Sequence, residues 1–105
     1  MSHSLVMVTA SSTEEAEKIA RSVLERRLAA CVSLVPGVKS IFWWEGKLDQ
    51  ASETLMLIKT TEEAVPALTE AVKQLHSYSV CEVISLPVVQ GNKPYLQWIE
   101  ETVRP

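Results

Sequence analysis

Apolar and polar residues alternate along the chain in a pattern that predicts four strands. Three are short runs rich in β-branched residues, a composition that fits a pleated, half-buried surface: Leu5–Ala10, Glu53–Thr60 and Val80–Val89. The fourth, Cys31–Gly46, is long and carries aromatic residues in its second half. Pro36 interrupts it, and because proline cannot donate to a strand ladder, we expect a bulge or bend there.

Apolar residues at helical spacing predict helices between these strands. Ser12 stands three residues before a glutamate, a capping-box pattern, and the apolar stripe that follows predicts a helix ending near Leu28. A second capping box ends at Glu63 and starts another helix, in whose first turn Pro66 is acceptable because its missing N–H has no partner there. Tyr95–Val103 is expected to form a short C-terminal helix.

The predicted order is therefore β-α-β-β-α-β followed by a helix. Two split βαβ units with right-handed crossovers give a four-stranded antiparallel sheet backed by two helices, the α+β architecture called ferredoxin-like. In this architecture the second and third strands form a long, bent central hairpin, with residues 45–50 as its connection. The chain has 105 residues, the size of one domain, so we expect residues 1–105 to form a single ferredoxin-like domain.

Composition and charge argue against several classes of function. Apolar residues make up 47% of the chain, and its net charge of -3 comes without a cluster of lysine or arginine, which argues against nucleic-acid binding. No apolar run approaches the roughly 20 residues that span a bilayer, and the N-terminus lacks the features of a secretory signal. Two cysteines are too few for a disulfide scaffold and favour a reducing compartment. We expect a cytoplasmic protein without nucleic-acid or membrane partners.

The second half of the long strand is apolar on both faces. Because residues two apart share a face, Ile41 and Trp43 lie on one face, and Phe42 and Trp44 lie on the other. A small monomer should expose one polar face of a hairpin to water, so two apolar faces indicate a subunit interface formed by these four residues. One alternative is that the C-terminal segment of the same chain covers the hairpin. Another is that the two tryptophans stack on a ligand ring, although such residues more often anchor interfaces.

The soft metal ligands of the chain are few and widely spaced. No CxxC or HExxH spacing occurs, so one chain does not obviously assemble a closed zinc site. A weak or inter-chain copper site would draw on His76, Cys31 and Cys81, since the N-terminus with His3 is expected to be mobile. The alternative is that the cysteines are small apolar core residues and that His76 caps the end of a helix.

No arrangement of residues typical of catalysis is found. The chain has no nucleophile elbow, and its three glycines cannot build a phosphate loop. An acylphosphatase-like site on this fold would need an arginine beside a cradle of backbone amides, and residues 9–12 contain neither arginine nor glycine. The polar residues Lys59, His76, Tyr78 and Glu82 either bind a small ligand or are solvated and salt-bridged groups. We therefore expect a protein that is not an enzyme.

Two blocks of the sequence resemble the CutA family, which is named for divalent-cation tolerance. The first runs from Arg27 to Thr60 and contains the motif RLAAC, a Pro-x-x-x-Ser spacing, Phe42-x-Trp44-x-Gly-Lys and the closing Ile-Lys-Thr. The second extends from His76 to Trp98 and includes Glu-Val-Ile and Leu-Pro steps. Three residues of the second block depart from the usual family pattern: Ser77, Ser79 and Cys81. At the position of Ser77 the family usually has proline.

The resemblance implies a homotrimer whose long bent hairpins pair between subunits. It also implies similarity to the trimeric PII signalling proteins, which bind small effectors in clefts between subunits, and Lys59, Tyr78, Glu82 and Trp44 would line such a cleft. Family members are linked to copper tolerance and, in animals, to acetylcholinesterase maturation. The implied function is a non-enzymatic scaffold with weak copper(II) binding, no obligatory cofactor and, in animal members, an acetylcholinesterase-related partner. The alternative is a PII-like sensor of a small anion or nucleotide.

Overall fold

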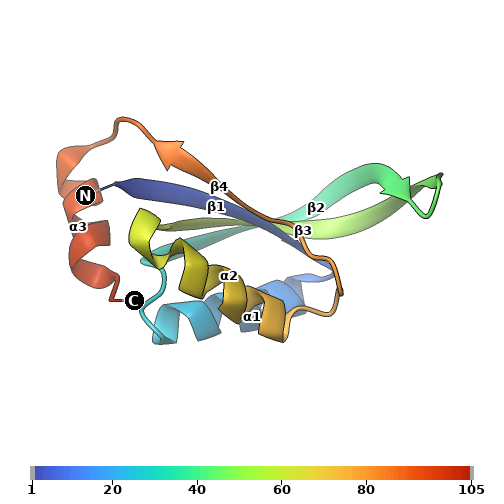
Figure 1. Ribbon diagram of the computed structural model, residues 1–105, viewed down its shortest axis with the longest axis horizontal. Coiled ribbons are helices and arrows are strands. Elements are labelled where there is room, and N and C mark those ends of the chain that lie inside the picture. The colour runs from blue at the N-terminus through green and yellow to red at the C-terminus, as the bar shows by residue number, and fades with distance from the viewer. Residues whose placement is uncertain (1, 105) are drawn as a thin grey trace.

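The computed structural model describes residues 2–104 and confirms the predicted α+β architecture. The four strands form one antiparallel sheet in the order β2-β3-β1-β4, and helices α1 and α2 cover one face of it (Figure 1). In the described part of the chain no helix is both long and apolar enough to cross a membrane. The elements in chain order are β1 (His3–Ala10), α1 (Thr13–Glu25), β2 (Cys31–Trp44), β3 (Lys47–Thr61), the 3₁₀ turn η1 (Glu62–Ala64), α2 (Val65–Leu75), β4 (Val83–Val88) and α3 (Lys93–Thr102).

The hydrophobic core lies between the sheet and these two helices. Val6 and Val8 of β1 stand opposite Ile58 and Met56 of β3, and all four side chains are fully buried. Burial of one such aliphatic side chain stabilises the fold by about 1.5–3 kcal/mol. The two helices place their apolar stripes against these strands, with Ala16, Ile19, Val23, Leu68 and Val72 fully buried.

The first predicted helix cap is confirmed, and the second is wrong. The Ser12 hydroxyl accepts the N–H of Glu15 at 3.1 Å, so α1 begins directly after a serine cap. No side chain caps η1 or α2. The Thr60 hydroxyl donates instead to the carbonyl of Leu28 at 2.7 Å, because Thr60 still belongs to β3 and faces the core. Pro66 lies in the first turn of α2, as predicted.

The central hairpin is longer than the sequence pattern predicted. β3 begins at Lys47, so most of the expected connection belongs to the strand, and the turn consists of Glu45 and Gly46. Both turn residues have positive φ, 50° and 79°, which is the geometry of a two-residue hairpin turn. The predicted bulge is present, because the pairing register shifts between Val35 and Val38. In Figure 1 the hairpin extends well beyond the helix layer.

The N-terminal strand begins earlier than expected and is held in place rather than mobile. His3 is buried, and its Nε2 lies 3.0 Å from the carbonyl oxygen of Leu96 and 2.9 Å from a carboxylate oxygen of Glu100. These contacts join β1 to α3, which also packs on Ala64. Helix α3 therefore lies at the end of the sheet away from the hairpin tip (Figure 1), and the C-terminal segment does not cover the hairpin. Strand β4 forms one edge of the sheet. It is shorter than predicted, because its pairing with β1 extends only from Val83 to Val88.

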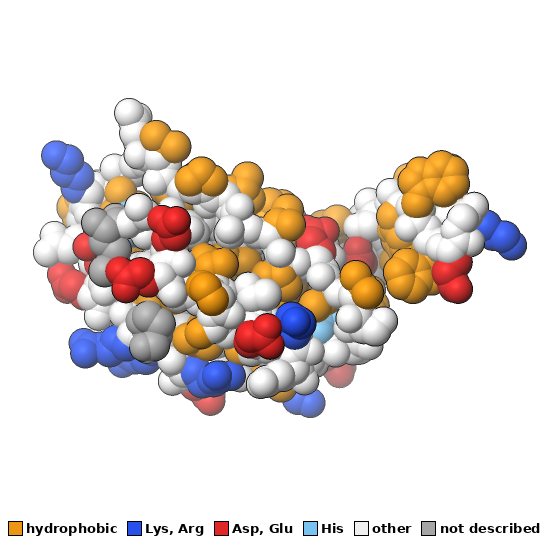
Figure 2. Space-filling view, viewed as in Figure 1, with side chains coloured by type: hydrophobic (Ala, Val, Ile, Leu, Met, Phe, Trp, Pro, Cys, Tyr) orange, Lys and Arg blue, Asp and Glu red, His pale blue; other side chains and the backbone are white. Residues whose placement is uncertain are grey.

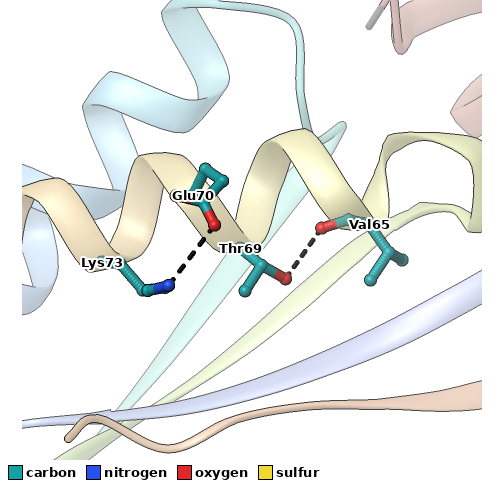
Figure 3. Close-up of polar contacts among 4 residues, drawn as sticks. All are labelled: Val65, Thr69, Glu70 and Lys73. Carbon is teal, nitrogen blue, oxygen red and sulfur yellow. Dashed lines mark hydrogen bonds and ion pairs between the residues drawn. The ribbon is translucent and has the colours of Figure 1, made fainter.

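The buried Thr60 hydroxyl provides a test of this packing. Thr60→Val removes the donor to the Leu28 carbonyl inside the core, so we predict a loss of about 1–3 kcal/mol in the free energy of unfolding. The matched control is Thr69→Val in α2, where a partly exposed hydroxyl donates to the Val65 carbonyl one turn earlier (Figure 3). Such a bond within a helix contributes little, so the control should change stability by less than about 0.5 kcal/mol. Urea unfolding measures both values, and equal losses would contradict the assignment.

Candidate binding groove at the base of the hairpin

A groove opens where the hairpin leaves the helix-covered part of the sheet. Its volume is about 720 Å³, within the range of roughly 300–1,000 Å³ that is usual for small-molecule sites. One wall consists of hairpin residues, and the other is the segment between α2 and β4, residues 78–82. The side chains in the lining that can carry binding chemistry are Phe42, Trp44, Asp49, Glu53, Tyr78 and Glu82.

His76 holds the segment that forms the second wall. Its Nδ1 accepts the N–H of Tyr78 at 3.0 Å, so its Nε2 carries the proton and donates to the carbonyl of Thr9 at 2.7 Å. The rings of His76 and Tyr78 also contact each other, with centroids 4.8 Å apart. His76 thus joins the end of α2 to β1. Its side chain does not cap α2, and neither ring nitrogen is left for a metal ion.

Glu15 holds the same segment from the side of α1. One carboxylate oxygen accepts the N–H and the hydroxyl of Ser11, both at 2.9 Å, and the other accepts the N–H of Ser77 at 2.7 Å. Burial by itself raises the pKa of the Glu15 carboxyl, but the hydrogen bonds from Ser77 and Ser11 outweigh burial and lower that pKa to about 2. The glutamate of the first capping box therefore also positions one wall of the groove.

Glu53 and Tyr78, which come from the two walls of the groove, are joined by a hydrogen bond. The Tyr78 hydroxyl donates to a Glu53 carboxylate oxygen at 3.0 Å. Burial, then this hydrogen bond and the negative charge of Glu53, raise the pKa of Tyr78 to about 12. The hydroxyl of Tyr78 is consequently protonated at physiological pH and serves as a neutral donor.

The structure brings together only part of the predicted cleft. Trp44, Tyr78 and Glu82 line the groove. Lys59 does not, because it lies further along β3, where its Nζ is 3.8 Å from the Cys31 thiol. Among residues 2–104 no lysine or arginine lines the groove, while Asp49, Glu53 and Glu82 do, so its charge is negative.

The predicted metal ligands do not form one site within a chain. His76 is engaged at both nitrogens, Cys31 lies beside Lys59, and Cys81 packs against the core near the start of β4. Both cysteines are free and partly buried. Within residues 2–104 no three histidine, cysteine or acidic side chains lie close enough to hold a metal ion. The sequence identified these ligand types, but their spacing in the chain did not show that the fold separates them.

The hairpin is apolar, and much of it is exposed in the single chain, including residues that line the groove. The exposed fractions of Ile41 and Trp43 are 67% and 72%, and Trp44 and Leu48 are also exposed. Figure 2 shows apolar side chains gathered on this projecting arm. The sheet face opposite the helices is apolar as well, because Leu5, Met7, Leu55, Leu57, Ile84 and Leu86 alternate with the core residues of their strands. Exposed apolar surface on this scale is typical of a contact site.

These features define a class: an α+β domain of the ferredoxin-like type with an apolar hairpin arm and a groove at its base. The family model described as CutA1 divalent ion tolerance protein matches residues 4–102. The chain belongs to this family, and the assignment predicted from the two sequence blocks is confirmed.

Curated relatives support the assignment. The mouse and human proteins named Protein CutA are 53% identical to this chain over 98 residues, which are 93% of this chain and 55% of each relative. The divalent-cation tolerance protein CutA of Thermus thermophilus is 47% identical over 97 residues, which are 92% of this chain and 94% of that protein. The chain therefore spans about half the length of the mammalian relatives and nearly all of the bacterial one.

Solved structures of the family match the whole fold. The crystal structure of CutA1 from Oryza sativa has a TM-score of 0.96 at 44% identity and covers 99% of this chain and 95% of its own. The structure from Archaeoglobus fulgidus, described as a periplasmic divalent cation tolerance protein, has a TM-score of 0.94 at 45% identity, with 97% and 99% covered.

Sequence reasoning missed three acidic residues of this region. Asp49 lies in β3 and not in the expected hairpin connection, and Glu15 holds the wall of the groove as well as standing in the first turn of α1. A signal for Glu53 was present, because alternation along β3 places it on the same face as Leu55 and Leu57, where a charged side chain is unusual.

The Glu15 contacts predict a pH dependence of stability. The folded-state pKa of about 2 lies below the ordinary glutamate pKa of 4.5, so the stabilisation by this carboxylate is fully present above about pH 4.5 and is lost as the pH falls toward 2. Glu15→Gln should therefore be less stable than the parent at pH 7, and the difference should shrink steadily between pH 4.5 and 2. Urea unfolding across this range measures it, with the exposed neighbour Glu14→Gln as control. A difference that does not vary with pH would assign the effect of Glu15 to packing.

Proposed function

We propose that this chain is a non-enzymatic binding protein that assembles as a homotrimer and acts in divalent-cation tolerance. The observation that carries the proposal is the arm of the hairpin, on which Ile41, Trp43, Trp44 and Leu48 stay exposed in a single chain. Tryptophan side chains of this kind are the usual anchors of protein interfaces. The trimeric state is the expectation that comes with the family resemblance.

The position of the arm supports contact between chains. It projects past α1 and α2, and α3 lies at the opposite end of the sheet, so these helices leave the arm uncovered (Figure 1). The outer edge of β2 has no partner strand within the described chain. Unpaired edge groups can bond a strand of another chain, while the apolar side chains pack against it.

Copper binding is the metal part of the proposal. The relatives from Thermus and Archaeoglobus are named divalent-cation tolerance proteins, and that name concerns those proteins. In this chain His76 is engaged, so copper would bind weakly, at Cys31 and Cys81 thiols contributed by neighbouring subunits. Thiolates prefer copper(I) to copper(II).

Three further expectations stay predictions. These are the acetylcholinesterase-related partner of animal members, the cytoplasmic location, and the PII-like sensing of an anion or nucleotide. The sensing of an anion or nucleotide has less support in this chain, because no basic side chain of the described residues lines the groove.

The assembly is tested by light scattering at micromolar concentration, which should give a trimer of the 11.7 kDa chain. Trp44→Ala removes an aromatic anchor and should weaken the assembly by about 2 kcal/mol or more. Leu75→Ala, which truncates an exposed apolar residue at the end of α2, is the control and should leave the mass unchanged. A monomeric parent protein would rule out the proposal.

The role of His76 is tested by titration with copper(II). His76→Ala removes the hydrogen bonds to Thr9 and Tyr78, so it should lower the free energy of unfolding by about 1–3 kcal/mol. Its copper affinity should stay within about threefold of the parent, which is well under 1 kcal/mol. A tenfold or greater loss would instead make His76 a copper ligand.

A further inference from the structure

A thiol and an amine lie in contact on neighbouring strands, at the end of the sheet beside α3. Cys31 of β2 stands directly opposite Lys59 of β3 in the pairing register, and the Nζ of Lys59 lies 3.8 Å from the Cys31 sulfur. The Cβ atoms of residues directly opposite in an antiparallel pair are about 4.5–5.5 Å apart, so the strand ladder itself holds these two side chains together.

The surroundings of this pair leave the amine as its main nucleophile. Lys59 also donates to the Ser33 hydroxyl, and within residues 2–104 it forms no ion pair with a carboxylate. The hydroxyl of Tyr95, from α3, faces the same sulfur. Burial, and then the negative charge of the Cys31 thiolate, raise the pKa of Tyr95, so this hydroxyl stays neutral. Of the groups around the sulfur, the Lys59 nitrogen is therefore the strongest nucleophile once it has lost its proton.

The second cysteine of the chain lies too far away to form a disulfide with Cys31. Through the strand pairing Cys31 is level with Leu5 of β1, whereas Cys81 precedes Val83, which is level with Val8. At a rise of about 3.3 Å per strand residue, the two cysteines are separated by roughly 10 Å or more along the strands alone. A disulfide joins residues whose Cα atoms are no more than about 7 Å apart.

We propose that Cys31 and Lys59 form a reversible covalent crosslink when the protein meets hydrogen peroxide. The Cys31 sulfur attacks one peroxide oxygen, the O–O bond breaks, and the products are a sulfenic acid and water. The Lys59 amine, having released its proton to solvent, then attacks this sulfur. An S–N bond forms, the S–O bond breaks, and the hydroxyl group leaves as a second water.

The two steps balance without any further reagent. The sulfur loses two electrons, the peroxide is reduced to two molecules of water, and the chain loses two hydrogen atoms. Because the amine is already held in contact with the sulfur, the second step is intramolecular and is favoured over capture by thiols in solution. Two equivalents of a thiol reductant restore both side chains.

The reaction needs neither a cleft nor a free surface. Both reacting groups belong to one chain, and peroxide is little larger than water. The pair lies ten residues along β2 from Ile41, roughly 30 Å at the strand rise, so it is outside the arm that the proposed assembly covers. The proposed copper site likewise requires that a small reagent reaches Cys31 in the assembly. The inference therefore goes beyond the proposed function and is compatible with it.

The test treats the assembled protein with hydrogen peroxide, with EDTA present to remove copper, and analyses proteolytic peptides by mass spectrometry. The parent should give a Cys31–Lys59 peptide pair that is lighter by two hydrogen atoms than its separate parts and at least about tenfold more abundant than in untreated protein. Dithiothreitol should remove it.

Substitutions identify the two partners. Lys59→Arg keeps a cation but has no amine that can lose its proton, so the sulfenic acid should persist, and dimedone should label Cys31 at least about threefold more than in the parent. Lys73→Arg, at an exposed lysine of α2, is the matched control and should crosslink like the parent. Cys81→Ser should also crosslink like the parent.

A competition experiment keeps the proposal testable if Lys59→Arg does not fold. Dimedone added to the parent together with peroxide captures the sulfenic acid and should suppress the crosslink. The proposal is overturned if the parent gives no Cys31–Lys59 pair, if excess dimedone leaves the pair undiminished, or if oxidised Cys31 is recovered in a disulfide between subunits. Light scattering of each sample reports the assembly separately, so a failure of the crosslink is distinguished from a failure of the proposed trimer.

Discussion

The structure depends on a mismatch between the length of its hairpin and the length of its helices. Helix α1 has 13 residues and β3 has 15. At about 1.5 Å per helical residue and 3.3 Å per strand residue, they span roughly 20 Å and 50 Å. One helix layer can therefore bury only the half of the hairpin that lies beside it. The other half projects as an arm, and the apolar residues on both of its faces can be covered only by another molecule.

The groove is a consequence of the same mismatch. At the point where the helices end, the chain leaves α2 and returns to the sheet through a segment without regular structure, residues 76–82. Side-chain hydrogen bonds, and not a strand ladder, hold this segment in position. His76 forms one with β1, Glu15 with Ser77, and Tyr78 with Glu53. These bonds come from three different elements, so the wall of the groove is set by the tertiary structure as a whole.

The departures from the family pattern bear on this wall. Ser77 stands where the CutA pattern usually has proline, and its N–H is the donor to Glu15, a bond that proline could not make. A chain with serine at this position loses the rigidity of proline and gains a charge-assisted hydrogen bond. Cys81 packs against the core, which matches the interpretation of a free cysteine as a small apolar residue.

The sequence by itself determined the fold class, the family, the bulge near Pro36 and the apolar character of the hairpin. Each follows from local pattern, because strand alternation, helical spacing and the motif RLAAC are read within short windows. The tertiary structure alone decided which side chains meet. Lys59 and Glu53 lie on the same strand, yet only Glu53 reaches the groove, and the expected ligands His76 and Cys31 contact different elements. Contacts between residues far apart in sequence depend on strand register and on where the helices end, and neither is encoded in local periodicity.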